Sequence, residues 1–417
     1  MDPTPSLRPA LRDWLLSSPL APCLEAFVAH LRLGRYAHRT SERYLGCIAH
    51  LGRWMSQCHL PLERLDEAMI ERFLGDHLRR CDGPSPVVHV RNDLRAACGH
   101  LLRVLREQGA VAAIRAATGP IANELRGFDE HLREVRGLAP ETRSNCLRVV
   151  QLLLQRRFAD GAVVIAELQP SDVREFLAEQ LDHRHTVSHA HALAAALRAY
   201  FRYRTTCGDQ VHGLVGVVTA PARWRLTSLP RSLSSAEVDR LLQSFTADLP
   251  SPRRGYAIVR CALDMGLRVG EVAGLTLSDI DWRAGTVTVR RTKSRREDVL
   301  PLPETTGRAL ADYLRHERPT TTNPAVFVRR FAPHDQPISA DAIHRVIRDA
   351  YQRIGLTHGR THALRHTLVR RLLEHGSSLK EVADVLRHRS LDTTLVYAKL
   401  DSPRLAAVAL PWPGSSA

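Results

Sequence analysis

The chain has 417 residues, and its hydrophobic fraction of 44% is sufficient for the cores of two or three domains. Its net charge is +15, and arginine carries nearly all of the positive charge, because Lys293, Lys380 and Lys399 are the only lysines. This basic excess predicts a polyanionic partner, with nucleic acid favoured over a membrane surface.

No apolar run is long enough to span a bilayer, and no signal peptide is recognisable, so we expect a cytoplasmic protein without membrane contact. The 8 cysteines form no CxxC or CxxxC pair. We therefore interpret them as reduced core residues, and we expect neither a metal site nor a disulfide framework.

The first part of the chain divides into an arm and a helical domain. Residues 1–18 are rich in proline and have no period, which predicts a flexible N-terminal arm. Residues 19–115 have apolar residues at helical spacing and predict an additional helical domain. Its four helices are expected near residues 24–31, 44–55, 66–74 and 90–105.

Residues 120–210 appear as a second helical domain that repeats this plan at an offset of about 102 residues. The matching pairs include Phe27 with Phe128, His30 with His131, Thr40 with Thr142, Phe73 with Phe176, Leu74 with Leu177 and Leu78 with Leu181. The few identities predict a duplication, which would give the chain two copies of one four-helix unit.

The last helix of the second copy interleaves arginines with aromatic residues. Arg198, Arg202 and Arg204 alternate with tyrosine and phenylalanine. This mixture suits a helix that packs on one side and contacts DNA phosphates on the other. A solvated basic face would explain any single one of these arginines equally well.

Glycine and proline break the helical pattern over residues 211–232, which predicts a linker. A third domain is expected at 233–404, opened by a capping box of Ser234 and Glu237. Residues 405–417 form a tail whose apolar strip could dock on a neighbouring protomer or pack on its own domain.

Two features early in the third domain point to phosphate chemistry. A buried helix ends at Gly266, and Arg268 and Glu271 follow it in a turn and the start of another helix. A β-hairpin is expected from strands at 286–289 and 299–302. Its tip carries Lys293, flanked by four arginines that resemble phosphate clamps: Arg290, Arg291, Arg295 and Arg296.

A lysine at this tip is notable in a chain that otherwise uses arginine. Lysine can give up a proton when its pKa is tuned, whereas arginine cannot readily do so. A titratable ammonium is therefore one interpretation of Lys293, and an ordinary solvated hairpin tip is the other.

The segment 361–401 contains the remaining candidate catalytic residues. His362 and Arg365 are three residues apart and thus share one face of a helix. His388 follows a second helix, and Tyr397 lies on a polar turn where we expect an exposed hydroxyl. Arginine binds phosphate, histidine moves protons and tyrosine can attack phosphorus.

The ordered set HALRHT, LRHRS and Tyr397, with GLR at Arg268 and Lys293 upstream, resembles the tyrosine site-specific recombinases of the phage-integrase and Xer family. The resemblance implies a mainly α fold with a small antiparallel β-sheet. SAM-like helical DNA-binding domains would precede an α+β catalytic domain. Residues 120–210 resemble the core-binding domain, and residues 19–115 resemble it more faintly.

The resemblance also implies a role for each residue in the cleavage and rejoining of DNA. Arg268 and Arg365 would hold the scissile phosphate, and Glu271 would support Arg268. Tyr397 would attack to form a 3′-phosphotyrosyl bond.

His362 would accept the tyrosine proton, Lys293 would protonate the leaving 5′ oxygen, and His388 would hydrogen-bond a phosphate oxygen. Neither ATP, a metal nor another cofactor is implied. The implied partners are double-stranded DNA and three further copies of the chain, which would make a tetramer.

The sequence departs from the family at Arg387, where the usual residue is glycine. If this position needs a positive φ, arginine costs about 1 kcal/mol or more there; alternatively, Arg387 adds a DNA contact. A type IB topoisomerase and a DNA-binding accessory protein with a decayed site remain as other interpretations. The first helical domain could also bind partner recombinases.

Overall fold

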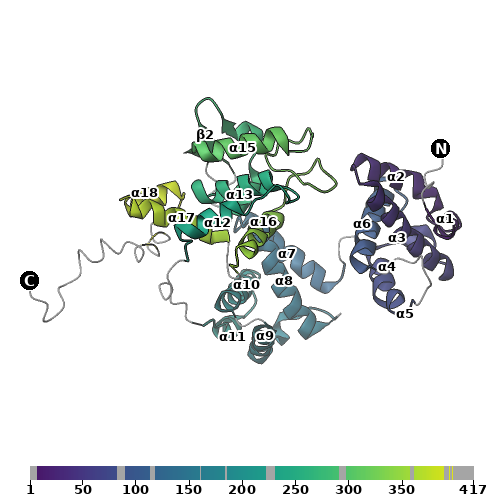
Figure 1. Ribbon diagram of the computed structural model, residues 1–417. Coiled ribbons are helices and arrows are strands. Elements are labelled where there is room, and N and C mark those ends of the chain that lie inside the picture. Colours follow the sequence, from purple (N-terminus) through teal and green to yellow (C-terminus); the bar gives the residue numbers. More distant parts are fainter. Residues whose placement is uncertain are drawn as a thin grey trace, which may run out of the picture. The chain divides into compact units, whose positions relative to one another are not determined.

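The computed structural model describes residues 7–81, 90–112, 118–159, 161–183, 186–221, 231–290, 297–356 and 361–388, together with Thr394 and Tyr397. These residues are mostly helical, with one three-stranded antiparallel sheet (Figure 1), as predicted. The chain divides into two compact units, Ala112–Arg225 and a second unit of Met1–Val111 with Leu226–Ala417.

The first helical domain has its own hydrophobic core. Its helices are α1 (Pro9–Leu16), α2 (Leu24–Leu33), α3 (His38–Gln57), α4 (Glu67–Arg72), α5 (Leu78–Arg80) and α6 (Arg91–Glu107), with a 3₁₀ turn η2 (Leu62–Arg64) and a π-helical turn η3 (Phe73–His77). Asp66 caps α4 by accepting a 2.8 Å hydrogen bond from the Met69 N–H.

The predicted N-terminal arm is wrong over much of its length. Residues 9–16 form α1, and its Leu11 and Leu15 are buried in the core of the first domain. One of the prolines that indicated an arm, Pro9, instead begins this helix, where a missing N–H costs nothing.

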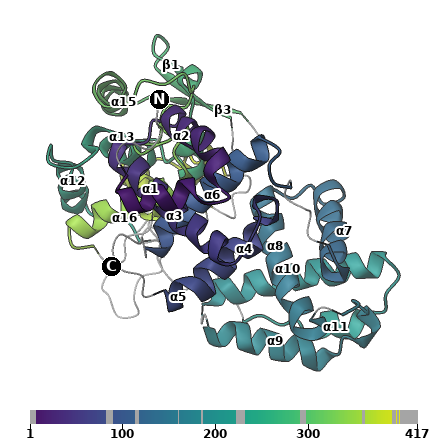
Figure 2. The ribbon, with the colours of Figure 1, turned by 90° about the vertical axis from the view of Figure 1, so that its right-hand side faces the viewer.

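The unit Ala112–Arg225 repeats the order of α2 to α6. It contains α7 (Pro120–Glu134), α8 (Pro140–Phe158), α9 (Pro170–His183) and α10 (Val187–Thr206), which Figure 2 shows together. A 3₁₀ turn, η4 (Ile165–Glu167), lies between α8 and α9 in the sequence. One difference is that α9 is an uninterrupted α-helix, whereas the first domain has the π-helical turn η3 at this place.

This unit also includes a short helix that the sequence did not predict. Residues 212–217 form α11 (His212–Val217), and Val211 and Leu214 are buried in the core of the unit. The domain therefore extends into the segment that was expected to be a linker from residue 211. Six residues are too few to give a recognisable helical period.

The third domain is built around the buried helix α13 (Pro252–Asp264). Helices α12 (Ser235–Gln243), α14 (Val269–Gly274), α15 (Glu304–His316), α16 (Ala340–Arg353), α17 (Thr361–Glu374) and α18 (Leu379–Val385) complete it. α13 packs against α15, α16 and α17. The predicted capping box of Ser234 and Glu237 starts α12.

The small sheet has the strand order β1 (Ile280–Asp281), β2 (Thr286–Val289) and β3 (Asp298–Pro301). The β2–β3 hairpin was predicted, and it pairs Thr286 with Pro301 and Val289 with Asp298. Within the described residues, no helix is both long and apolar enough to cross a membrane.

Candidate active site

The turn after α13 holds the first part of the site. Gly266 has a φ of +60°, the left-handed conformation that glycine adopts without strain. Its carbonyl accepts a hydrogen bond from the guanidinium of Arg365 on α17, and the Leu386 carbonyl accepts a second one. Arg365 is 5% exposed, so these two backbone oxygens fix a buried guanidinium between α13, α17 and α18.

Glu271 is the carboxylate at the centre of the site. It is buried on α14 and accepts 2.8 Å hydrogen bonds from the backbone N–H and the Nη1 of Arg268. Its Oε2 also accepts a 2.6 Å hydrogen bond from Arg387 Nη2. The structure thus brings Glu271 against Arg268, the residue that it was expected to support.

Three guanidinium groups therefore lie around one buried carboxylate. Burial, together with the nearby charges of Arg268 and Arg387, lowers the pKa of Arg365 to about 9. Burial also lowers the pKa of Arg387. Buried guanidinium groups that outnumber the carboxylates beside them cost folding free energy unless another anion neutralises their charge. This arrangement is therefore suited to binding a phosphate.

Arg387 occupies the left-handed position that ends α18. Its φ is +54°, its N–H donates to the Asp384 carbonyl, and the His388 N–H donates to the Ala383 carbonyl. This is the Schellman pattern, in which glycine is the usual residue. The structure supports the interpretation of a backbone that needs a positive φ, and the Arg387 side chain, only 3% exposed, faces Glu271.

Tyr397 is held inside the domain by a histidine that the sequence analysis did not single out. Its hydroxyl and His366 Nδ1 are 2.8 Å apart. Tyr397 is 3% exposed, so the expected exposed hydroxyl is not found. Burial raises the pKa of Tyr397, although Arg365 and Arg268 oppose the shift.

His366 follows Arg365 in the HALRHT motif, which is the signal that could have identified it. Burial, with the charges of His362 and Arg365, lowers the pKa of His366 to about 4. Its ring is therefore neutral near pH 7. His362 is exposed one turn earlier on α17, with its ring centroid 6.3 Å from that of His366.

His388 also lies beside the tyrosine ring. The two rings are nearly parallel, with centroids 6.4 Å apart, and His388 Nδ1 is 2.8 Å from Thr394 Oγ1. Burial and the charges of Arg365, Arg268 and Arg387 lower the pKa of His388 to about 4. A neutral imidazole here can donate one hydrogen bond without adding to the positive charge.

The predicted DNA contacts near the hairpin are only partly described. Lys293, Arg291, Arg295 and Arg296 lie outside the described residues. Arg290 is half-exposed and bonds Asp279 at 2.6 Å and Glu297 at 3.2 Å.

The three arginines of α10 have different surroundings. Arg204 is mostly buried and pairs with Glu124 at 3.0 Å and Asp209 at 2.7 Å. Arg198 donates to the Val218 carbonyl at 2.9 Å. Arg202 is exposed. Among the three, Arg202 is therefore the residue best placed for a phosphate, while Arg204 has a structural role within its unit.

Comparisons with known proteins identify the family of the chain. The Phage integrase family model matches residues 231–404, and the model for the phage integrase N-terminal SAM-like domain matches residues 125–207. A protein of Sinorhizobium fredii named as an integrase/recombinase, y4rA, is 36% identical over 374 residues, which cover 88% of each chain.

A second Sinorhizobium fredii protein named as an integrase/recombinase, y4rF, is 31% identical over 97% of this chain and 94% of its own length. That similarity includes the first helical domain. The tyrosine recombinase XerD of Yersinia pestis is 32% identical over 57% of this chain and 79% of its own.

Solved structures share the fold. XerH bound to a palindromic difH substrate superposes with a TM-score of 0.53 at 17% identity, covering 72% of this chain and 99% of XerH. A lambda integrase fragment, residues 75–356, solved as a dimer on a core site, gives a TM-score of 0.51 at 17% identity, covering 70% of this chain and 97% of that fragment. The chain belongs to the phage integrase family and is a tyrosine recombinase, an enzyme that cuts and rejoins DNA.

Proposed function

We propose that the scissile phosphate of duplex DNA binds where Arg268, Arg365 and Arg387 surround Glu271. The observation that carries this proposal is the excess of buried guanidinium groups over carboxylates, in the same domain as the hydrogen-bonded hydroxyl of Tyr397. Arg268 and Arg365 would contact the phosphate, and Arg387 would hold Glu271 in place. Such fixed donors stabilise the charge that develops in the transition state.

Tyr397 is the proposed nucleophile. Its oxygen attacks phosphorus, the bond from phosphorus to the 5′ oxygen breaks, and a 3′-phosphotyrosyl bond forms. The 5′ oxygen leaves with a proton from Lys293, the proposed general acid. A 5′ hydroxyl from the partner strand then reverses the step, so the energy of the broken bond is retained in the covalent link.

Two histidines of α17 share the handling of the tyrosine hydroxyl in this proposal. His366, neutral because its pKa is about 4, holds the hydroxyl in position before attack. His362 is the proposed acceptor of the proton, since a free tyrosine has a pKa of about 10 and needs a base at neutral pH. His388 would donate a hydrogen bond to a phosphate oxygen.

The proposed partners are double-stranded DNA with a specific recombination site and three further copies of this chain. Support comes from lambda integrase, which has been solved as a tetramer bound to a Holliday junction and resembles this chain with a TM-score of 0.50. The net charge of +15 fits a protein that closes around a polyanion.

Covalent trapping tests this proposal. The protein is incubated with DNA fragments that flank its own gene, the complexes are precipitated with detergent, and the trapped ends are sequenced. Wild-type protein should yield DNA joined through a 3′ phosphate, and Tyr397→Phe should yield none. Tyr256→Phe is the matched control, because Tyr256 is a part-buried tyrosine of the same domain whose hydroxyl bonds Arg260.

The other interpretations predict different results. A type IB topoisomerase would relax supercoiled plasmid without joining strands from two duplexes. A protein with a decayed site would bind the DNA, yet neither wild type nor variant would be trapped. Trapping that persists in Tyr397→Phe would show that another residue is the nucleophile.

A further inference from the structure

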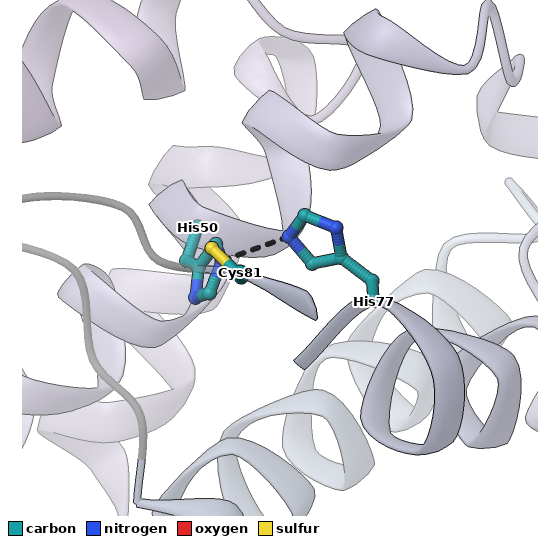
Figure 3. A group of neighbouring side chains, drawn as sticks. All are labelled: His50, His77 and Cys81. Atoms are coloured by element: carbon teal, nitrogen blue, oxygen red, sulfur yellow. Dashed lines mark hydrogen bonds between the residues drawn. The ribbon is translucent and has the colours of Figure 1, made fainter. Parts of the chain in front are cut away.

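Three side chains of kinds that bind metals converge in the first helical domain. They are His50 from the middle of α3, His77 at the end of η3 and Cys81 just after α5 (Figure 3). His50 Nε2 is 3.1 Å from His77 Nε2 and 3.6 Å from Cys81 Sγ. All three potential ligand atoms lie within 4.8 Å of one another.

The surrounding packing fixes these side chains in place. His50 is 1% exposed, and its ring meets the edge of Phe73 with centroids 5.1 Å apart. The ring of His77 stacks on Phe73 at 5.4 Å. Both imidazoles belong to one aromatic cluster, so their mutual approach is a property of the folded domain and not of freely rotating surface side chains.

His50 Nε2 is shared by two neighbours in this geometry. A ring nitrogen of a neutral imidazole offers either one N–H or one lone pair. His50 Nε2 faces both His77 Nε2 and Cys81 Sγ, so one hydrogen atom on that nitrogen serves only one of the two contacts well. A single metal ion between the three atoms would contact all of them.

The second helical domain has the same helix order without the cluster, so its residues at the equivalent positions show what packing alone requires there. With Thr40 aligned to Thr142, an offset of 142 − 40 = 102, His50 corresponds to Leu152. With Phe73 aligned to Phe176, an offset of 103, the other two residues correspond to Gln180 and Arg184. Leu152 packs against the core of its unit, as expected for this position of the fold. The ligand set is therefore specific to the first domain.

The π-helical turn η3 is the local feature that accompanies the cluster. Such turns are rare and occur often at functional sites. Here η3 ends at His77, four residues before Cys81, whereas the equivalent helix α9 has no such turn. The first domain thus differs from its repeat both in the residues and in the backbone that presents them.

We propose that His50, His77 and Cys81 bind a divalent transition metal, with Zn²⁺ as the favoured ion. Zinc takes imidazole nitrogen at about 2.0–2.1 Å and thiolate sulfur at about 2.3 Å in tetrahedral geometry. Those lengths place two nitrogens roughly 3.3 Å apart and a nitrogen and a sulfur roughly 3.6 Å apart. The separations in the protein are 3.1 Å and 3.6 Å.

Binding would couple the metal to the fold of the first domain. Cys81 loses its thiol proton to become the thiolate ligand, and both imidazoles bind as neutral rings. The ion joins the middle of α3 to the chain just after α5, segments that are about 30 residues apart in sequence. Water or another ligand completes the fourth position. The role of this site is to fix the first domain, separately from the chemistry at Tyr397.

The test uses full-length protein without an affinity tag that binds metals. Wild type, stripped with a chelator and titrated with Co²⁺, should bind one ion per chain and develop a thiolate-to-cobalt charge-transfer band with tetrahedral visible bands. Cys81→Ser should lose the charge-transfer band. His77→Gln should weaken Co²⁺ binding by at least the roughly 10–100-fold that loss of a supporting group costs.

The matched control is Cys58→Ser, which removes an exposed cysteine of the same domain outside the cluster and should bind Co²⁺ as wild type does. A charge-transfer band that persists in Cys81→Ser, or wild type without stoichiometric binding, would overturn the proposal. X-ray absorption of the wild type bound to Zn²⁺ decides the matter without any variant. One sulfur and two imidazoles in the metal's coordination shell support the site, and a shell without sulfur refutes it.

Discussion

At the scale of single residues, Arg387 combines an unfavourable backbone conformation with a favourable side chain. Its φ of +54° costs about 1 kcal/mol for a residue with a Cβ atom. Its guanidinium bonds the buried carboxylate of Glu271 at 2.6 Å. Arginine at this position therefore joins a strained backbone to a buried ion pair with Glu271.

Two substitutions at this position separate the effect of the backbone conformation on stability from the effect of the side chain. Arg387→Ala and Arg387→Gly both remove the guanidinium, but only glycine relieves the strain at positive φ. We expect Arg387→Gly to be more stable than Arg387→Ala by about 1 kcal/mol in urea unfolding. Equal stability of the two variants would mean that the left-handed conformation does not constrain this residue.

The two neutral histidines of the site make stability depend on pH. Their pKa values are about 4 in the folded protein, against an ordinary value of about 6.5 in the unfolded chain. Between these values the unfolded chain binds more protons, so the free energy of unfolding falls as pH falls from about 6.5 to about 4. Their stabilising contribution is complete above pH 6.5.

Urea unfolding at several pH values checks this dependence. His366→Gln and His388→Gln should each flatten the loss of stability between pH 6.5 and 4. His375→Gln, which changes an exposed histidine of the same domain, should keep the wild-type slope. An unchanged slope in both site variants would contradict the assignment of neutral, buried imidazoles.

Motifs that are local in sequence could be predicted, whereas contacts between distant segments could not. The turn at Arg268, the spacing of His362 and Arg365, and the capping box of α12 each depend on residues a few positions apart. The bond from Arg387 to Glu271 spans 116 positions, and no pattern in the sequence indicated it. The cysteines were compared only with one another, so the histidines beside Cys81 were missed.

At the scale of secondary-structure elements, the junction between α13 and α14 controls where Arg365 lies. A Cβ atom at Gly266 would come within 2.9 Å of Leu368 Cδ2 and 3.1 Å of Leu386 Cδ2. The same residue has a left-handed backbone and supplies a carbonyl to Arg365. This junction therefore has both a conformational and a steric reason to require glycine.

Gly285 provides a control for the steric part of that requirement. It has a φ of +64° with nothing within 4 Å of the added Cβ position. Gly285→Ala should cost roughly the 1–2 kcal/mol of the left-handed backbone alone. Gly266→Ala should cost more in urea unfolding and should also slow covalent trapping of DNA. Equal losses of unfolding free energy in the two variants would show that the Leu368 and Leu386 side chains move aside at little cost.

Element length decided which helices could be predicted. The 20-residue helices α3 and α10 contain several turns of apolar period and were expected. The eight residues of α1 and the six of α11 were interpreted as an arm and a linker, because one or two turns do not establish a period. In the folded chain, burial of Leu15 and Leu214 stabilises them.

At the scale of the whole molecule, the net charge of +15 predicts DNA binding that weakens steeply with salt. Not every arginine contributes, because many are paired with carboxylates of the protein. On α10, Arg202 is exposed, whereas Arg204 pairs with Glu124 and Asp209. The two residues thus offer a matched comparison within one helix.

Binding of duplex DNA measured over a range of salt concentrations distinguishes them. Arg202→Gln should reduce the slope of log affinity against log salt by about 1, the value for one lost phosphate contact. Arg204→Gln should leave that slope unchanged and lower the melting temperature instead. If only Arg204→Gln reduced the slope of log affinity against log salt, Arg204 would be the phosphate contact and Arg202 would not.

The ion pair of Arg387 with Glu271 also limits how this sequence can diverge. With glycine at 387, position 271 needs to satisfy only Arg268. Once arginine occupies 387, loss of the acid leaves a second buried guanidinium without its carboxylate, beside Arg365. The two sites must then change together or in a fixed order. Descendants of this chain inherit a constraint between positions 271 and 387 that a chain with glycine at 387 would not have.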